Sequence, residues 1–280
     1  MSTAPKPKAA IRSPITYYGG KQMLVGDILP LIPKHTTYVE PFFGGGAIFW
    51  AKKPSHVEVV NDLNRSVINF YQVAKNNFAA LQALIQASAL SRSLYEDAMI
   101  MYKYPHLFKD VERAWAFWVL TNQGFVGKIG SFGYGTSDNK RELNIANKRL
   151  AFNNVLTERL ELVQMECTDA LRIIELRDRE ETFFYCDPPY IDSNQGHYGG
   201  YTKEHYELLL TALSKIKGKF LLSSFPSESL DNFTKAHGWF QFEITMPCAS
   251  SKHKKPKTEV LTANYDITKM RDNGHAVSDV

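Results

Sequence analysis

The stretch "TTYVEPFFGGGAIFWAKK" (residues 36–53), together with "HVEVVNDLN" (residues 56–64) just after it, decides the fold class. The first stretch starts as a short apolar strand, passes through three glycines and continues as an apolar helix. The second has the β-branched residues of another strand and ends at Asp62, and a helix is expected from about Arg65 to Lys75. A strand, a loop, a helix and a strand in this order predict a parallel α/β sheet.

The same alternation of strands and helices returns in the last part of the chain. The apolar segments "ELVQMEC", "ETFFYCD", "GKFLLSS" and "FQFEITM" predict further strands, whereas residues 77–122 show helical periodicity without a clear strand. We therefore predict an α/β domain made of residues 1–70 and 160–280, with a flexible tail at 1–12. A mostly helical insertion at 71–159 separates its two halves.

Composition and charge exclude several classes of protein. The 280 residues are 44% hydrophobic, which is enough for a substantial core, and the net charge of +4 is compatible with nucleic-acid binding without requiring it. The three cysteines have no C-x-x-C spacing and the histidines are scattered, so we expect neither a disulfide framework nor a metal site. No apolar run reaches the length of a membrane span and residues 1–10 lack a signal core, so we expect a cytoplasmic protein.

The glycine loop and the acid after the second strand point to a nucleotide-like ligand. Gly44 and Gly46 let the backbone approach a ligand closely at the start of a helix, and Asp62 ends the next strand, where an acid commonly binds ribose hydroxyls. The alternative is that Asp62 only caps the helix that follows. The three glycines do not form G-x-G-x-x-G, so the pattern favours an adenosine ligand without a pyrophosphate.

The stretch "FFYCDPPY" (residues 183–190) ends a strand with an acid, two prolines and an aromatic ring. An Asp187 carboxylate and the Pro188 carbonyl, held side by side, can accept both hydrogens of one amino group, such as the exocyclic amine of adenine. This holds the amine lone pair available for methyl transfer, while Tyr190 stacks on the base. The alternative is a tight turn that merely ends the strand.

Taken together and in order, the motifs "YYGGK", "VEPFFGGGAIF", "VVNDLN", "CTDA" and "CDPPY" resemble those of α-group DNA adenine-N6 methyltransferases, the family of the Dam enzymes. The resemblance covers nearly the whole chain after the tail. It implies a Rossmann-like catalytic domain with S-adenosyl-L-methionine as methyl donor. It also implies that the insertion at 71–159 is a target-recognition domain and that the substrate is double-stranded DNA.

The resemblance also assigns roles to individual residues. It implies that Asp62 holds the cofactor ribose and that Asp169 meets the cofactor adenine, although an N-cap role explains Asp169 equally well. Tyr17 stands where family members often have tryptophan. The implied catalytic residues are Asp187, Pro188, Pro189 and Tyr190. The implied cofactor-binding residues are Tyr17, Lys21, Glu40, Phe42, Gly44, Gly46, Asp62, Asp169 and Asp187.

Two stretches are predicted to contact DNA. The glycine-rich segment 121–144 carries basic residues where the family has a recognition hairpin, and the segment 244–258 carries lysines and no acid. The predicted DNA-binding residues are Asn122, Lys128, Lys140, Arg141, Lys252, Lys254, Lys255 and Lys257. The alternative for both segments is an ordinary solvated loop. The polar segment 191–200 resembles a lid over the target base, closed with the help of Tyr198 and Tyr201.

Two other readings share parts of this pattern. Methyltransferases that act on RNA adenine or on protein glutamine usually carry asparagine in place of Asp187 and lack an insertion between the glycine loop and the motif. A catalytically silent DNA-binding relative would keep the fold, but it would have no reason to keep both the glycine loop and "DPPY". We therefore expect a DNA methyltransferase, with a restriction endonuclease as a further partner.

Overall fold

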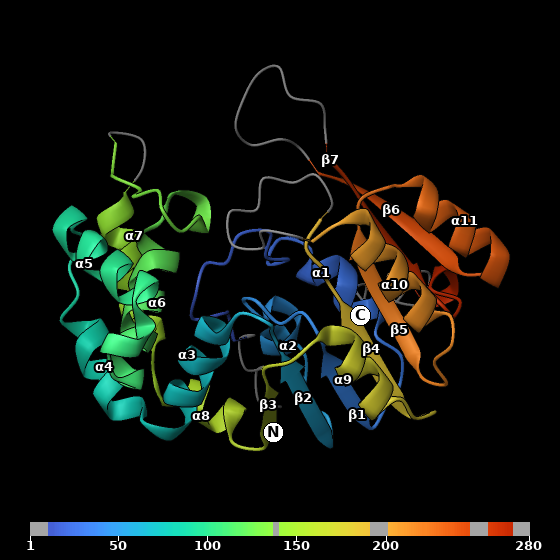
Figure 1. Cartoon of the computed structure of the whole chain (residues 1–280), viewed down its shortest axis with the longest axis horizontal. Coiled ribbons are helices and arrows are strands. Elements are labelled where there is room, and N and C mark those ends of the chain that lie inside the picture. Colours follow the sequence, from blue (N-terminus) through green and yellow to red (C-terminus); the bar gives the residue numbers. More distant parts are fainter. Residues whose placement is uncertain (1–10, 137–139, 191–200, 247–256, 271–280) are drawn as a thin grey trace, which may run out of the picture.

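The computed structural model describes residues 11–136, 140–190, 201–246 and 257–270, and its centre is a seven-stranded sheet (Figure 1). The strand order is β3-β2-β1-β4-β5-β7-β6. The first five strands of this order pair in parallel, and β7 is antiparallel to both β5 and β6. The strands are β1 (Thr37–Glu40), β2 (Val57–Asn61), β3 (Val163–Glu166), β4 (Thr182–Cys186), β5 (Lys219–Ser224), β6 (Phe240–Met246) and β7 (Lys257–Ala263).

Helices cover both faces of the sheet. Figure 1 shows α9, α10 and α11 over one face, where Val39, Phe184 and Leu222 contribute to one apolar core. A second apolar core on the other face includes side chains of α1, α2 and α3. The helices are α1 (Val25–Ile28), α2 (Ala47–Ala51), α3 (Arg65–Asn76), α4 (Phe78–Gln86), α5 (Arg92–Lys103), α6 (Asp110–Gln123), α7 (Arg141–Ala151), α8 (Asn154–Leu160), α9 (Ala170–Arg177), α10 (Lys203–Leu213) and α11 (Glu228–His237), with 3₁₀ turns η1 (Leu29–Leu31), η2 (Pro105–Leu107) and η3 (Phe125–Gly127).

The central strands explain why their sequences are almost continuously apolar. All five residues of β4 are buried, because a parallel strand with helices on both faces has no solvent-facing side. The strands expected at "ELVQMEC", "ETFFYCD", "GKFLLSS" and "FQFEITM" are all present. The sequence analysis missed β7, whose apolar residues are interrupted by Glu259 and Thr262, both buried. The α/β class with a Rossmann-like order of strands is confirmed.

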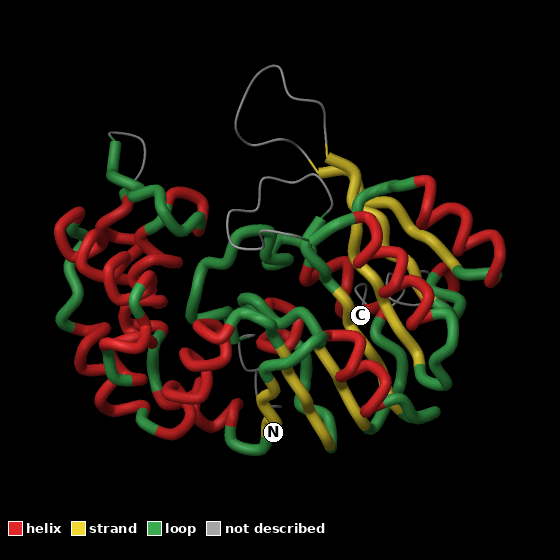
Figure 2. The backbone as a smooth tube through the Cα atoms, viewed as in Figure 1, coloured by secondary structure: helices red, strands yellow, loops and turns green. Residues whose placement is uncertain are grey.

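The described part of the expected insertion is mostly helical, and it lies beside the sheet (Figure 2). Its core is continuous with the core of the sheet domain. Phe70 of α3 contacts Phe117 of α6 and Phe152 after α7, with ring centroids 6.2 Å apart in both pairs. Helix α3 runs unbroken through the predicted boundary at residue 71. The helices after α3 are therefore anchored to the sheet through a shared aromatic core.

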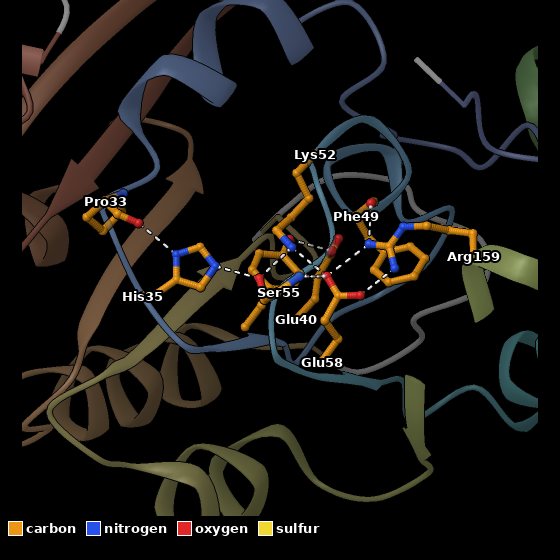
Figure 3. Close-up of polar contacts among 9 residues, drawn as sticks. Pro33, His35, Glu40, Phe49, Lys52, Ser55, Glu58 and Arg159 are labelled. Carbon is orange, nitrogen blue, oxygen red and sulfur yellow. Dashed lines mark hydrogen bonds and ion pairs between the residues drawn. The ribbon is translucent and has the colours of Figure 1, made fainter. Parts of the chain in front are cut away.

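A buried cluster of charges ties the end of the insertion to the sheet. Arg159 of α8 donates to both carboxylate oxygens of Glu58 on β2 and to the carbonyl of Phe49, and Lys52 donates to Glu58 from the other side (Figure 3). The Lys52 ammonium also lies 4.3 Å from the ring centroid of Tyr38. Removal of one partner from such a network leaves a buried charge without compensation. The cluster therefore holds β2 and α8 in a fixed relation.

No helix of the described segments is both long enough and apolar enough to cross a membrane.

Candidate active site

The candidate active site lies where the connections of the sheet change direction. β1 and β4 are neighbours, but α2 after β1 packs on one face and α10 after β4 packs on the other. Glu40 is the last residue of β1, and Asp187 directly follows β4. Open α/β sheets bind ligands at this kind of switch point, outside the carboxyl ends of the strands.

Three cavities meet at this edge of the sheet, and Pro189 lines all of them. The first lies between the glycine loop, the "YYGGK" turn and the "DPPY" segment. The second is bounded by the segments after β2 and β3 and by the start of α10. The third lies between Tyr190 and the residues after β5. Every predicted catalytic or cofactor-binding residue lines the first or the second cavity.

Asp187 is held by Lys21 at the junction of these cavities. The distance between Lys21 Nζ and Asp187 Oδ1 is 2.6 Å, and the Tyr190 hydroxyl lies 3.4 Å from the same oxygen. No group of the described residues donates to Oδ2, and the carboxyl is 19% exposed. Burial raises the pKa of Asp187 to about 6, although the Lys21 ammonium lowers it. Asp187 is therefore an ionised acceptor at neutral pH, with one oxygen available.

Tyr190 forms an aromatic wall together with Phe225. Their ring centroids are 4.2 Å apart, and both residues line the third cavity. The Tyr190 hydroxyl donates to Glu259 of β7, and Lys21 Nζ lies 4.8 Å from the Tyr190 ring centroid. Neither Phe225 nor Glu259 was predicted from the sequence. The signal for Phe225 was its place just after a predicted strand, whereas nothing local marked Glu259.

The glycine loop has a conformation that other residues would not tolerate. Gly44 has φ +47° and Gly46 has φ +61°. A Cβ atom at Gly44 would lie 2.8 Å from the ring of Tyr17, and one at Gly46 would lie 2.5 Å from the ring of Phe43. The Gly44 N–H donates to Asp62 Oδ2 at 2.7 Å. Asp62 therefore fixes the loop that forms one wall of the first cavity.

Helix capping was the alternative role for Asp62 and Asp169. Asn64, and not Asp62, caps α3, because the Asn64 side chain accepts from Ser66 N–H at 3.0 Å. Asp169 does cap α9, since it accepts from the Leu171 N–H at 2.8 Å. Both acids also line the second cavity. A cap occupies one oxygen of Asp169, so capping and ligand binding are compatible.

Glu40 is a second buried acid beside the first cavity. It is 2% exposed, and its Oε2 accepts from the Tyr38 hydroxyl at 2.7 Å. Burial raises the pKa of Glu40 to about 8, and the charge of Asp187 contributes in the same direction. Most Glu40 side chains are therefore protonated at neutral pH, and the site carries less negative charge than its sequence indicates.

Two residues predicted to bind DNA are engaged inside the protein. Asn122 is buried, accepts from the backbone N–H of Thr16 at 3.1 Å and donates to the carbonyl of Pro14. The Arg141 guanidinium donates to the carbonyls of residues 122–124, and burial lowers its pKa. These contacts support a role in fixing the base of the glycine-rich loop, and DNA contact by these two residues stays a prediction.

The other predicted DNA-binding residues are placed differently. Lys140 is exposed and Lys128 is partly exposed, both near the glycine-rich loop. Lys252, Lys254 and Lys255 lie outside the described residues, as does Tyr198, and Lys257 is placed only as the first residue of β7. The sequence analysis did not single out the turn η3, where Phe125 and Val126 are 62% and 61% exposed.

Sequence comparison places this site in a known family. A profile described as D12 class N6 adenine-specific DNA methyltransferase matches residues 17–246, which include the glycine loop and the "DPPY" segment. The chain belongs to this family. It is 26% identical over 291 residues to the type II methyltransferase M1.LlaDCHI of Lactococcus lactis subsp. cremoris, and this match covers 95% of the chain and 99% of that enzyme.

Two further similarities are more partial. The chain is 28% identical over 193 residues to the DNA N-6-adenine-methyltransferase of Escherichia phage P1, covering 66% of this chain and 25% of that protein. A crystal structure of a SAM-dependent methyltransferase from Agrobacterium tumefaciens matches with a TM-score of 0.40 and 12% identity, covering 86% of this chain and 60% of the other.

Family membership confirms the expected class of enzyme. The chain is an adenine-specific DNA methyltransferase, and its methyl donor is S-adenosyl-L-methionine. DNA is its substrate, rather than the RNA or protein of the alternative readings. Among the described residues there is no group of three or more histidine, cysteine, aspartate or glutamate side chains that could hold a metal ion.

Proposed function

We propose that this enzyme methylates the N6 amine of an adenine that has left the DNA stack, with Asp187, Pro188, Pro189 and Tyr190 as its catalytic residues. The observation that carries the proposal is the junction at Pro189. There the cavity of the glycine loop, the cavity of Asp62 and Asp169, and the cavity of Phe225 all meet. Such a junction brings a donor and a target base to one carboxylate.

The target amine would be held by the chain's own acceptors. Asp187 Oδ2 accepts one N–H, and the Pro188 carbonyl, which the rigid Pro188–Pro189 backbone holds in place, accepts the other. Two acceptors on one amine favour a tetrahedral nitrogen, with its lone pair away from the ring. The aromatic wall of Tyr190 and Phe225 supplies the stacking that an unstacked base loses. Proximity and electrostatics then supply most of the rate.

The second cavity suits the adenosine half of the cofactor. Asp62 and Asp169 offer acceptors for ribose hydroxyls and an amine, and Phe42 offers an apolar face. The Tyr201 hydroxyl is buried there without a hydrogen-bond partner among the described residues, which is the kind of group that a polar ligand satisfies. Tyr17, Lys21, Glu40, Gly44 and Gly46 would surround the remaining, methionine end. When bound, S-adenosyl-L-methionine supplies the methyl group.

The DNA would lie across the open edge of the three cavities. The exposed tip of η3 supports this proposal, since Val126 keeps a φ of +54° that a β-branched residue rarely adopts. Strain of this kind clusters at functional sites. We propose that Phe125 and Val126 contact the duplex, while Lys128 and the lysines of residues 252–257 contact phosphates.

The cellular setting follows from the relatives. The relative from Lactococcus lactis subsp. cremoris is named a type II methyltransferase, and on this similarity we propose a restriction endonuclease as the partner system. The cytoplasm stays the predicted location.

The test of the proposed chemistry is Asp187→Ala. The variant should keep its fold, because Asp187 follows β4 and lies outside both apolar cores, and should bind S-adenosyl-L-methionine and unmethylated duplex DNA through its other contacts, but it should not transfer the methyl group. Calorimetry measures the binding of the cofactor and of the duplex, and a filter assay with labelled donor measures methyl transfer. Turnover near that of the wild type would show that Asp187 is not the acceptor.

A further inference from the structure

Glu259 is a buried acid that the proposed chemistry does not use. It lies on β7, is 1% exposed, and shares its side of the strand with Leu261 and Ala263 of the apolar core. A charged side chain at such a position lowers stability unless other groups compensate it. An apolar residue would fill the same space without that penalty, so the contacts of the carboxylate decide what it does.

Three donors from three different segments converge on Glu259 Oε1. The Tyr190 hydroxyl donates to it from the segment after β4, and the Ser223 hydroxyl donates to it from β5 at 2.5 Å. Lys21 Nζ lies 3.6 Å away, on the turn before α1. Because β5 lies between β4 and β7 in the sheet, Glu259 connects β7 to Asp187 and Tyr190, which follow β4.

Two carboxylates of the described residues lie within reach of the Tyr190 hydroxyl, which has only one proton to donate. Asp187 Oδ1 is 3.4 Å away, and Glu259 Oε1 is closer. Without Glu259, the hydroxyl would donate to Asp187. The Tyr190 ring would then move with it, and a second strong donor beside Lys21 on Asp187 Oδ1 would weaken the carboxylate as an acceptor for the target amine at Oδ2.

We propose that Glu259 is a positioning residue that draws the Tyr190 hydroxyl away from Asp187, so that the Tyr190 ring stays in its place and Asp187 keeps its acceptor strength for the target amine. This inference rests on the proposed roles of Asp187 and Tyr190. Ser223 supports Glu259 in turn, by holding its Oε1 toward the site.

The charge of Glu259 has a second effect on the same carboxyl. It faces the ion pair of Lys21 and Asp187 and raises the pKa of Asp187. Other titratable groups also face Asp187. Glu40 lies on β1, Tyr185 and Cys186 lie on β4, Tyr190 follows β4, and Lys21 precedes α1. A neutral replacement of Glu259 should therefore leave Asp187 ionised down to a lower pH.

A double-mutant cycle tests the positioning role. In the otherwise wild-type enzyme, Glu259→Leu should lower kcat on unmethylated duplex DNA by about tenfold to a hundredfold. The reason is that the Tyr190 ring leaves its position beside Asp187. In a Tyr190→Phe background, where no hydroxyl can turn to Asp187, the same change should cost less than about threefold. An equal loss in both backgrounds would mean that Glu259 only supports β7, and would overturn the proposal. A crystal structure of Glu259→Leu provides a readout without turnover: Tyr190 on Asp187 supports the proposal, and an unmoved Tyr190 overturns it.

Glu259→Gln is the conservative variant, since it keeps an acceptor oxygen and removes only the charge. The acid limb of its kcat/KM profile should shift to lower pH by roughly half a unit or more. Ser223→Ala is the matched control, because it removes one hydrogen bond to Glu259 and keeps the charge, and its limb should shift less than that of Glu259→Gln. An unshifted limb in Glu259→Gln would overturn the electrostatic effect. If Asp187 is not the acceptor of the target amine, the outcome is different: Asp187→Ala would then be active, with or without Glu259.

Discussion

The carboxylate of Asp187 should make the folded protein less stable at neutral pH. Its pKa is raised from an ordinary 3.8 to about 6, so the folded state holds the proton more tightly than the unfolded state. The stability gained from the protonated Asp187 side chain is fully present below about pH 4 and is lost as the pH rises through 6. This difference in pKa corresponds to about 3 kcal/mol in the free energy of unfolding.

Asp187→Asn removes the charge and keeps the shape. At pH 8 the variant should be more stable than the wild type by up to about 3 kcal/mol, and the difference should fade toward pH 4. Urea unfolding without cofactor, followed by circular dichroism at both pH values, measures it. Asp97→Asn is the control, because Asp97 is exposed on α5, and its effect should be small at both pH values. A variant less stable than the wild type at pH 8 would refute the reasoning, as would a difference that does not depend on pH.

Three more predictions follow from the site. The kcat/KM of the wild type should fall about tenfold for each pH unit below 6, because Asp187 must be ionised to accept the amine. Initial rates from pH 5 to 8.5 measure this dependence, and a flat profile would contradict it. Replacing the four lysines of residues 252–257 by alanine should weaken DNA binding on all sequences and reduce the dependence of the binding constant on salt. Fluorescence anisotropy measures both, and an unchanged salt dependence would show that these lysines do not contact the DNA. Asp169→Ala should cost about 1 kcal/mol of stability and also cofactor affinity, whereas Asp169→Ser should keep the cap and lose only affinity; full affinity in the serine variant would leave Asp169 with its cap alone.

The parts of the fold that were predictable are those with a local signal. Buried parallel strands are continuous apolar runs, and the glycine loop needs glycine because Gly44 and Gly46 have a positive φ. The segment 187–190 could be recognised as a strand end, since prolines stop a strand. These features depend on neighbouring residues, so the glycine loop and the candidate acid Asp187 at a strand end were predictable from the sequence.

The missed parts depend on pairings between distant residues. Lys21 and Asp187 are 166 positions apart, and their ion pair follows from the sheet order rather than from either motif. Glu259 enters the site only because β7 pairs with β5, and its own strand was hidden by buried polar residues. Arg141 shows the converse: a basic residue in a glycine-rich segment suggested DNA contact, whereas its guanidinium donates to backbone carbonyls.

The most direct test of the account is methyl transfer from labelled S-adenosyl-L-methionine to unmethylated duplex DNA, beside RNA and protein, with nucleoside analysis of the product. The account predicts N6-methyladenine in DNA alone with the wild type, and no label with Asp187→Ala. Label in RNA or protein, or N6-methyladenine made by the alanine variant, would contradict it.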